Sequence, residues 1–92
     1  MKNSAEIKFD SLSVNERFAR IAVSAFASAL DPTVEELSDI KTAVSEAVTN
    51  SIVHGYRNSK GEVEMKMYID GNVLRIEIVD YGAGIENVKK AM

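Results

Sequence analysis

Hydrophobic and polar residues alternate in three short segments of the chain, the period typical of half-buried β-strands. The segments lie at 5–9, 63–69 and 74–78, and a turn signal, Asp70-Gly71, separates the second from the third. This pattern predicts one strand near the N-terminus and a β-hairpin near the C-terminus. Each strand has one apolar face, which requires a covering layer.

The sequence between the first strand and the hairpin has the 3.6-residue period of two amphipathic helices. The first is expected to follow a capping box at 13–16 and run to about Leu30, and Asp31-Pro32 should break it. Its predicted core stripe is Phe18, Ile21, Ala22, Ala25 and Ala29. The second should follow a capping box at 33–36 and end near Gly55, with an inner side of Leu37, Ile40, Val44, Ala47, Val48 and Ser51.

The order strand, helix, helix, strand, strand predicts an α+β fold: a two-layer sandwich whose antiparallel-rich mixed sheet is covered on one face by helices. With 92 residues, the chain can form one core, so residues 1–92 are expected to be a single domain. The methionines at 65 and 67 have strand spacing and are interpreted as core residues without a function.

Composition limits the classes of function. The chain is 46% hydrophobic and has no apolar run of membrane-spanning length. A net charge of -3 argues against direct binding to nucleic acid, which requires a clustered basic surface. The absence of cysteine and of a signal-peptide h-region favours a cytoplasmic location, with no membrane partner.

Polar residues form two candidate groups on this framework. Glu46, Asn50 and His54 are spaced four apart, so successive positions rotate by only about 40° and lie on one helical stripe. Asp80 shares the parity of the apolar residues before it, so its carboxylate should face the helices, where it needs a donor. Gly82 and Gly84 would allow a ligand to approach the backbone closely.

Each feature also has an ordinary structural interpretation. Glu46 and Asn50 are compatible with a solvated helix face, and His54 with a helix C-terminus favoured by the macrodipole. The Asp80-x-Gly82-x-Gly84 pattern is compatible with a strand-ending turn. Their joint occurrence in this order favours a ligand site.

The motif Glu46-x-x-x-Asn50-x-x-x-His54-Gly55-Tyr56, followed by Asp80-x-Gly82-x-Gly84, resembles the N box and first glycine box of the Bergerat-type ATPases. The runs at 30–33 and 39–46 are similar to the branch of anti-sigma-factor serine kinases from spore-forming bacteria. The resemblance covers nearly the whole chain. It implies a protein that binds and inhibits a sporulation sigma factor and uses Mg-ATP to phosphorylate a serine of its anti-anti-sigma factor.

The resemblance also implies roles for individual residues. Asn50 matches the magnesium ligand and Glu46 the general base. Asp80 matches the acceptor for the adenine amino group, with Gly82 and Gly84 bordering the nucleotide and His54 grouped with the nucleotide-binding residues. Arg20 lies on the helix that this branch uses for partner contacts and is the predicted interface residue.

The family pattern continues with an ATP lid and a second glycine-rich box, for which these 92 residues have no counterpart. An incomplete Bergerat fold with weak phosphoryl transfer is therefore expected. An exposed sheet edge favours a homodimer, and strand exchange is one form of it. Two alternatives stay open: a sigma-binding module without catalysis, and the ATP-binding domain of a histidine kinase or another Bergerat ATPase.

Overall fold

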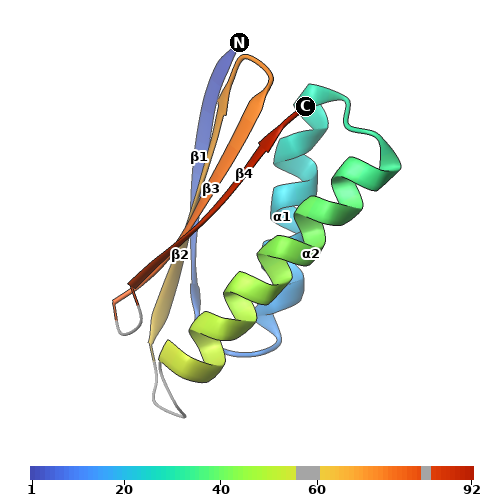
Figure 1. The fold of residues 1–92 in the computed structure, drawn as a ribbon. Helices are drawn as coiled ribbons and strands as arrows, with labels where there is room; N and C mark the ends of the chain where they lie inside the picture. The colour runs from blue at the N-terminus through green and yellow to red at the C-terminus, as the bar shows by residue number, and fades with distance from the viewer. Residues whose placement is uncertain (56–60, 82–83) are drawn as a thin grey trace.

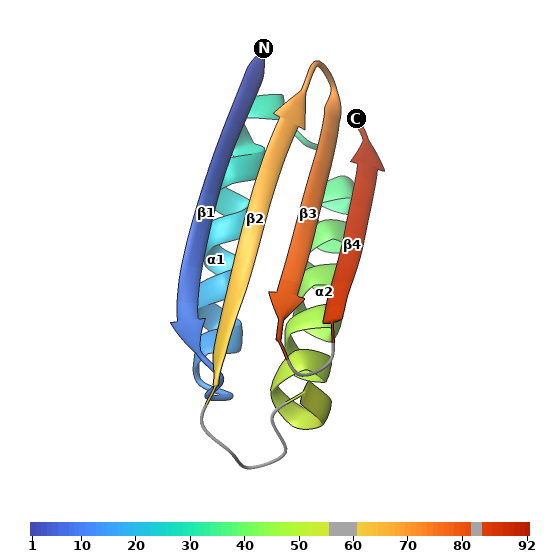
Figure 2. The same cartoon turned by 90° about the vertical axis from the view of Figure 1, so that its left-hand side faces the viewer.

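A computed structural model describes residues 1–55, 61–81 and 84–92, with residues 54 and 55 described by their backbone alone. Figure 1 shows a sheet with both long helices on one face, and Figure 2 looks onto the uncovered face. The elements are, in chain order, β1 (Lys2–Asp10), α1 (Asn15–Ala27), the 3-10 turn η1 (Ser28–Leu30), α2 (Val34–Asn50), the π-helical turn η2 (Ser51–Gly55), β2 (Glu62–Asp70), β3 (Val73–Asp80) and β4 (Gly84–Ala91).

The four described strands lie in the order β1-β2-β3-β4, and each neighbouring pair is antiparallel. The predicted α+β two-layer sandwich is thereby confirmed. The sheet departs from the expected mixed form in one respect, because the pairing of the described strands is antiparallel throughout.

The predicted β2–β3 hairpin is present, and its two-residue turn lies one residue later than the predicted Asp70-Gly71. Asp70 pairs with Val73, so Gly71 and Asn72 form the two-residue turn, and Gly71 has a φ of +62° that favours glycine. From this turn, alternate residues of both strands point to the helices. The buried hairpin residues on that side are Val63, Met65, Met67, Ile69, Leu74, Ile76 and Ile78.

The helices bury the other half of the same core. Ile40, Val44, Ala47 and Val48 of α2 are buried, as the sequence predicted, and Leu37 packs at the margin. The buried methionines at 65 and 67 confirm their interpretation as core residues.

Helix α1 faces the core with a different stripe from the predicted one. Its fully buried residues are Ala19, Val23 and Ala27, and among the predicted positions only Ala22 is partly buried. Phe18 and Ile21 are 48% and 60% exposed, and Ala25 and Ala29 are also exposed. Small side chains let α1 approach its neighbours closely, while Phe18 packs edge-on against Phe9 at a ring distance of 6.2 Å.

The two predicted capping boxes have opposite outcomes. At α2 the box is present: the Thr33 hydroxyl accepts from the Glu36 amide at 3.0 Å, and the Glu36 carboxylate accepts from the Thr33 amide at 2.9 Å. At α1 the box is absent, because the N-cap is Val14 in a helical conformation and no side chain caps it. The prediction of a cap at Ser13 was therefore wrong.

Strand β4 was not predicted from the sequence. Only Val88 and Lys90 within it are partly buried, so the segment lacks a clear alternating pattern. Its pairing with β3 holds it in the sheet, and the Lys90 ammonium lies 3.5 Å from the Asp39 carboxylate of α2. None of the helices in the described part of the chain is long and apolar enough to cross a membrane.

The two predicted boxes allow a matched test of side-chain capping at α1 and α2. Thr33→Ala should lower the free energy of unfolding by about 1 kcal/mol, because it leaves an N-terminal amide of α2 without its acceptor. Ser13→Ala should change it by less than about 0.5 kcal/mol, since that hydroxyl caps nothing. Urea denaturation followed by circular dichroism measures both. Equal losses in the two variants would contradict the assignment.

Candidate functional site

The exposed side of α2 carries the first group of predicted site residues. Glu46 and Asn50 are both exposed, and they line one surface hollow of about 350 Å³ together with Ser45 and Thr49. Helical spacing predicted that Glu46 and Asn50 would share a stripe, and the structure places them side by side in this hollow, hereafter the α2 hollow.

The exposed side chains of the α2 hollow supply oxygen ligands of three kinds: the Glu46 carboxylate, the Asn50 amide and the Thr49 hydroxyl. Hard cations such as Mg²⁺ prefer oxygen ligands and take one or two from protein when phosphates supply others. The donor set therefore fits a magnesium ion bound with a phosphate ligand. Ser45 and Thr49 were not predicted; their spacing of four from one another, next to Glu46 and Asn50, was the available signal.

A second hollow, of about 290 Å³, lies where α1 meets α2 and brings Arg20 and Glu46 to a common surface. The Arg20 guanidinium lies 3.7 Å from the carboxylate of Glu16, one helical turn earlier, and the Arg20 side chain is 40% exposed. Ser45 lines both hollows, and its buried hydroxyl has no hydrogen-bond partner among the described residues. The residues around this interhelical hollow are Glu16, Arg20, Ser38, Lys41, Thr42, Ser45 and Glu46.

Asp80 lies at the end of β3 and is only 3% exposed. It pairs with Val63 on one side and Gly84 on the other, and its parity directs it toward the helices, as predicted. Figures 1 and 2 both place this end of β3 at the same end of the molecule as the C-terminus of α2, and η2 packs against β3. Asp80 itself lines neither the α2 hollow nor the interhelical hollow.

The remaining predicted positions are described to different extents. Gly84 begins β4 with a φ of +107°, a conformation that side chains rarely adopt, although a Cβ there would meet nothing within 4 Å. His54 belongs to η2 by its backbone, and its side chain lies outside the described part. Gly82 and Tyr56 also lie outside the described residues.

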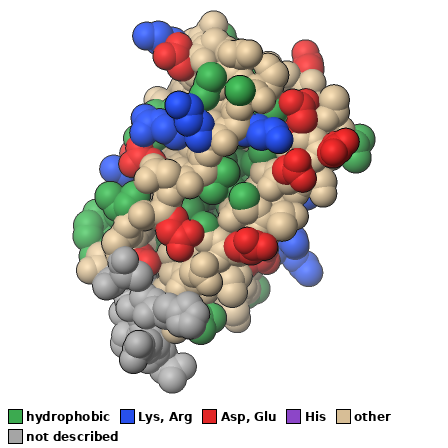
Figure 3. Space-filling view, in the orientation of Figure 1, with side chains coloured by type: hydrophobic (Ala, Val, Ile, Leu, Met, Phe, Trp, Pro, Cys, Tyr) green, Lys and Arg blue, Asp and Glu red, His purple; other side chains and the backbone are tan. Residues whose placement is uncertain are grey.

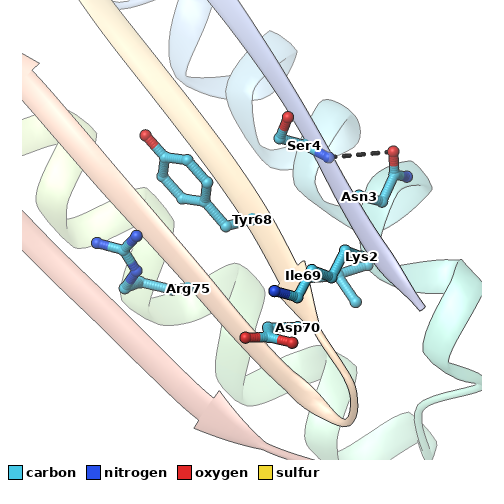
Figure 4. Close-up of a pocket in the computed structure, with 7 residues that line it drawn as sticks. All are labelled: Lys2, Asn3, Ser4, Tyr68, Ile69, Asp70 and Arg75. Atoms are coloured by element: carbon cyan, nitrogen blue, oxygen red, sulfur yellow. Dashed lines mark hydrogen bonds between the residues drawn. The ribbon is translucent and has the colours of Figure 1, made fainter.

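A third hollow, of about 480 Å³, lies on the uncovered face of the sheet, and none of the predicted site residues lines it (Figure 4). The Arg75 guanidinium stacks 4.4 Å from the centre of the Tyr68 ring and pairs with Glu77 at 2.9 Å. Two of the residues that line this hollow, Tyr68 and Arg75, thus already contact one another.

In the orientation of Figure 1, acidic and basic side chains are interspersed over the surface that Figure 3 shows.

Comparison of the sequence with known proteins places the chain in a family. The profile of the histidine kinase-like ATPase domain matches residues 10–92. The chain is 58% identical over 90 residues to the anti-sigma F factor of Thermoanaerobacter sp. (strain X514), covering 98% of this chain and 63% of that protein. It is 54% identical over 92 residues to the anti-sigma F factor of Clostridium acetobutylicum, covering 100% of this chain and 64% of that protein.

A third relative, the anti-sigma F factor of Anoxybacillus flavithermus, is 51% identical over 92 residues, which are 99% of this chain and 63% of that protein. The chain therefore spans somewhat less than two thirds of the length of these relatives. The match of the ATPase profile extends over α1, α2 and the last three strands, and so includes Glu46, Asn50 and Asp80. On these grounds, the chain belongs to the histidine kinase-like ATPase domain family.

Proposed function

We propose that the chain is the nucleotide-binding part of an anti-sigma F factor, which holds a sporulation sigma factor and phosphorylates a serine of an anti-anti-sigma protein with Mg-ATP in the cytoplasm. The observation that carries this proposal is the α2 hollow, in which Glu46 and Asn50 lie side by side within a chain of the ATPase family. The names of the relatives, which are 51–58% identical, support the sigma-binding role.

In the proposed site, the nucleotide is bound at two places. Asn50 holds magnesium through its amide oxygen, which suits a hard cation. Asp80 accepts a hydrogen bond from the amino group of adenine, because its carboxylate is buried on the helix-facing side of the sheet. Gly82 and Gly84 border the nucleotide, and His54 belongs to the same group. Residues 1–92 would then form one nucleotide-binding domain.

Glu46 is the proposed general base. It lines both the α2 hollow, with Asn50, and the interhelical hollow, with Arg20. A serine hydroxyl presented from the Arg20 side would give its proton to the Glu46 carboxylate as its oxygen bonds to the γ-phosphorus of ATP and the bond from that phosphorus to the ADP leaving group breaks. When bound, Mg-ATP supplies the phosphoryl group and the cation that neutralises its charge. The exposure of Glu46 keeps its carboxylate accessible to an incoming protein substrate.

Two substitutions should separate binding from transfer. Asn50→Ala should abolish magnesium-dependent binding of ATP, because it removes the metal ligand, while Asn87→Ala, at an exposed asparagine of β4, should leave it unchanged. Glu46→Gln should retain ATP binding and lower phosphate transfer by about 100-fold or more. Isothermal titration with and without magnesium, and transfer of labelled phosphate to the anti-anti-sigma protein, give the two readouts. Unchanged magnesium-dependent affinity in Asn50→Ala would remove the metal assignment.

Arg20 is the proposed contact to the sigma factor. Its ion pair with Glu16 is half-exposed, and such surface pairs contribute little to stability, so the guanidinium can change partners at small cost. Arginine is also enriched among residues that dominate protein interfaces.

Charge reversal on α1 tests this contact. Arg20→Glu should weaken binding of purified sigma F factor by at least about tenfold, because an interface arginine would be lost and replaced by a repulsive group. Arg17→Glu makes the same charge change at an exposed position one turn away and should alter affinity less than about threefold. Surface plasmon resonance at two salt concentrations measures both. Equal losses would indicate a general effect of net charge and would contradict the assignment.

We also propose a homodimer. The nine-residue strand β1 lies at one edge of the described sheet, and edge strands offer backbone groups for pairing with another chain. Beside it, Val14 at the N-cap of α1 and Phe18 and Ile21 within α1 are 73%, 48% and 60% exposed. Burial of these side chains against a second copy would stabilise the pair.

Light scattering at tens of micromolar should therefore give about twice the chain mass of 10.1 kDa. Ile21→Asp should shift the mass toward the monomer, because it would bury a carboxylate in the proposed interface. Val34→Asp, at an 89% exposed residue of α2, is the matched control and should leave the dimer intact. A monomer mass for the unsubstituted chain would contradict the proposal.

A further inference from the structure

Tyr81, the residue after Asp80, forms a side-chain hydrogen bond on the open face of the sheet. Since successive residues of a strand point to opposite sides, Tyr81 faces away from the helices. Its hydroxyl donates a hydrogen bond to Glu64 Oε1 at 3.2 Å, and the ammonium of Lys8 lies 3.5 Å from the same oxygen. Side chains from β1, β2 and the first residue after β3 thus meet on the open face directly behind Asp80.

Glu64 is unusual for a residue on the uncovered face, because it is only 7% exposed. Burial of a carboxylate is costly unless hydrogen bonds and opposite charges compensate it, and Tyr81 and Lys8 supply both. The cross-strand partner of Glu64 is Val79, which is 8% exposed. Glu64 is therefore tied to the residue before Asp80 through the sheet and to the residue after it through a side-chain hydrogen bond.

We propose that Glu64 and Tyr81 are positioning residues for the nucleotide site: their hydrogen bond fixes the backbone on both sides of Asp80 and so aims the buried carboxylate at adenine. This inference rests on the proposed function of Asp80. Neither residue touches the nucleotide, since their hydrogen bond lies on the far side of the sheet from the helices. Their effect on the base passes through the Asp80 backbone alone.

The chemistry of the base allows misplacement of Asp80 to be distinguished from a general loss of stability. The measured quantity is the ratio of the affinities for ATP and inosine triphosphate. Adenine presents an amino group to the Asp80 carboxylate, whereas the hypoxanthine base of inosine triphosphate presents a carbonyl oxygen at the same position, which a carboxylate cannot accept from. A well-placed Asp80 therefore favours ATP over inosine triphosphate. Misplacement of its carboxylate lowers affinity for ATP and leaves the affinity for inosine triphosphate nearly unchanged.

The test is a titration of Mg-ATP and Mg-inosine triphosphate into the 92-residue chain and three variants. Tyr81→Phe removes the hydroxyl and keeps the ring, which is 77% exposed, so the fold should persist. We expect it to weaken ATP binding about fivefold, the size of one hydrogen bond, and to change inosine triphosphate binding less than about twofold. Glu64→Gln keeps an acceptor oxygen for Tyr81 and should retain the preference for ATP. Tyr68→Phe, on the same face, is the matched control and should behave as the unsubstituted chain.

The outcomes separate this inference from the function on which it rests. A preference for ATP that persists in Tyr81→Phe, or equal weakening of both nucleotides, would overturn the positioning role and leave the nucleotide site in place. Failure of the unsubstituted chain to bind either nucleotide would overturn the site itself, and the positioning role with it. Selective loss of ATP affinity in Tyr81→Phe, with the preference kept in Glu64→Gln, would establish the positioning role.

Discussion

The register between β2 and β3 determines which side chains the sheet buries. The two-residue turn at Gly71-Asn72 sets this register, and alternate residues of both strands then face the helices as far as Asp80. A shift of one residue would move every member of this set to the open face, because the side-chain period of a strand is two. The apolar core and the buried carboxylate of Asp80 therefore depend on the same pairing. The stability of the fold and the orientation of the proposed adenine acceptor are linked through it.

The same alternation of side chains determines which polar residues lie on the open face of the sheet. Glu64 and Tyr81 occupy positions of opposite parity to the core residues, so the register that buries Asp80 also brings these two together behind it. On the other layer, α2 divides its surface between an apolar stripe against the sheet and a polar flank that carries Glu46 and Asn50. The proposed site is thus built from the exposed flank of one helix and the end of one buried strand, two elements held at a fixed distance by a common core.

The sequence predicted those parts of the fold that one strong local signal specifies. The hairpin had clear alternation and a turn signal within one residue of the observed turn, and α2 had both a helical period and a true capping box. Helix α1 was harder to orient, because two apolar stripes one residue apart both satisfy the helical period. The structure buries the one with the smaller side chains, Ala19, Val23 and Ala27, a choice that depends on interhelical and helix–sheet distances. Strand β4 had little alternation of its own and is held by tertiary pairing with β3. For the site, helical and strand periods predicted where Glu46, Asn50 and Asp80 lie, but not the contacts of Glu64 and Ser45, since those require the relative placement of separate elements.

We propose that the register between β2 and β3 carries Asp80 into position to bind adenine. Calorimetric titration of Mg-ATP into the chain and into Asp80→Asn tests it most directly, with circular dichroism to verify that the variant is folded. We expect saturable binding by the unsubstituted chain and a loss of affinity of at least about tenfold in the folded variant, whose neutral amide is a weaker acceptor than the carboxylate. Equal affinity in the two folded proteins, or no binding by either, would contradict it.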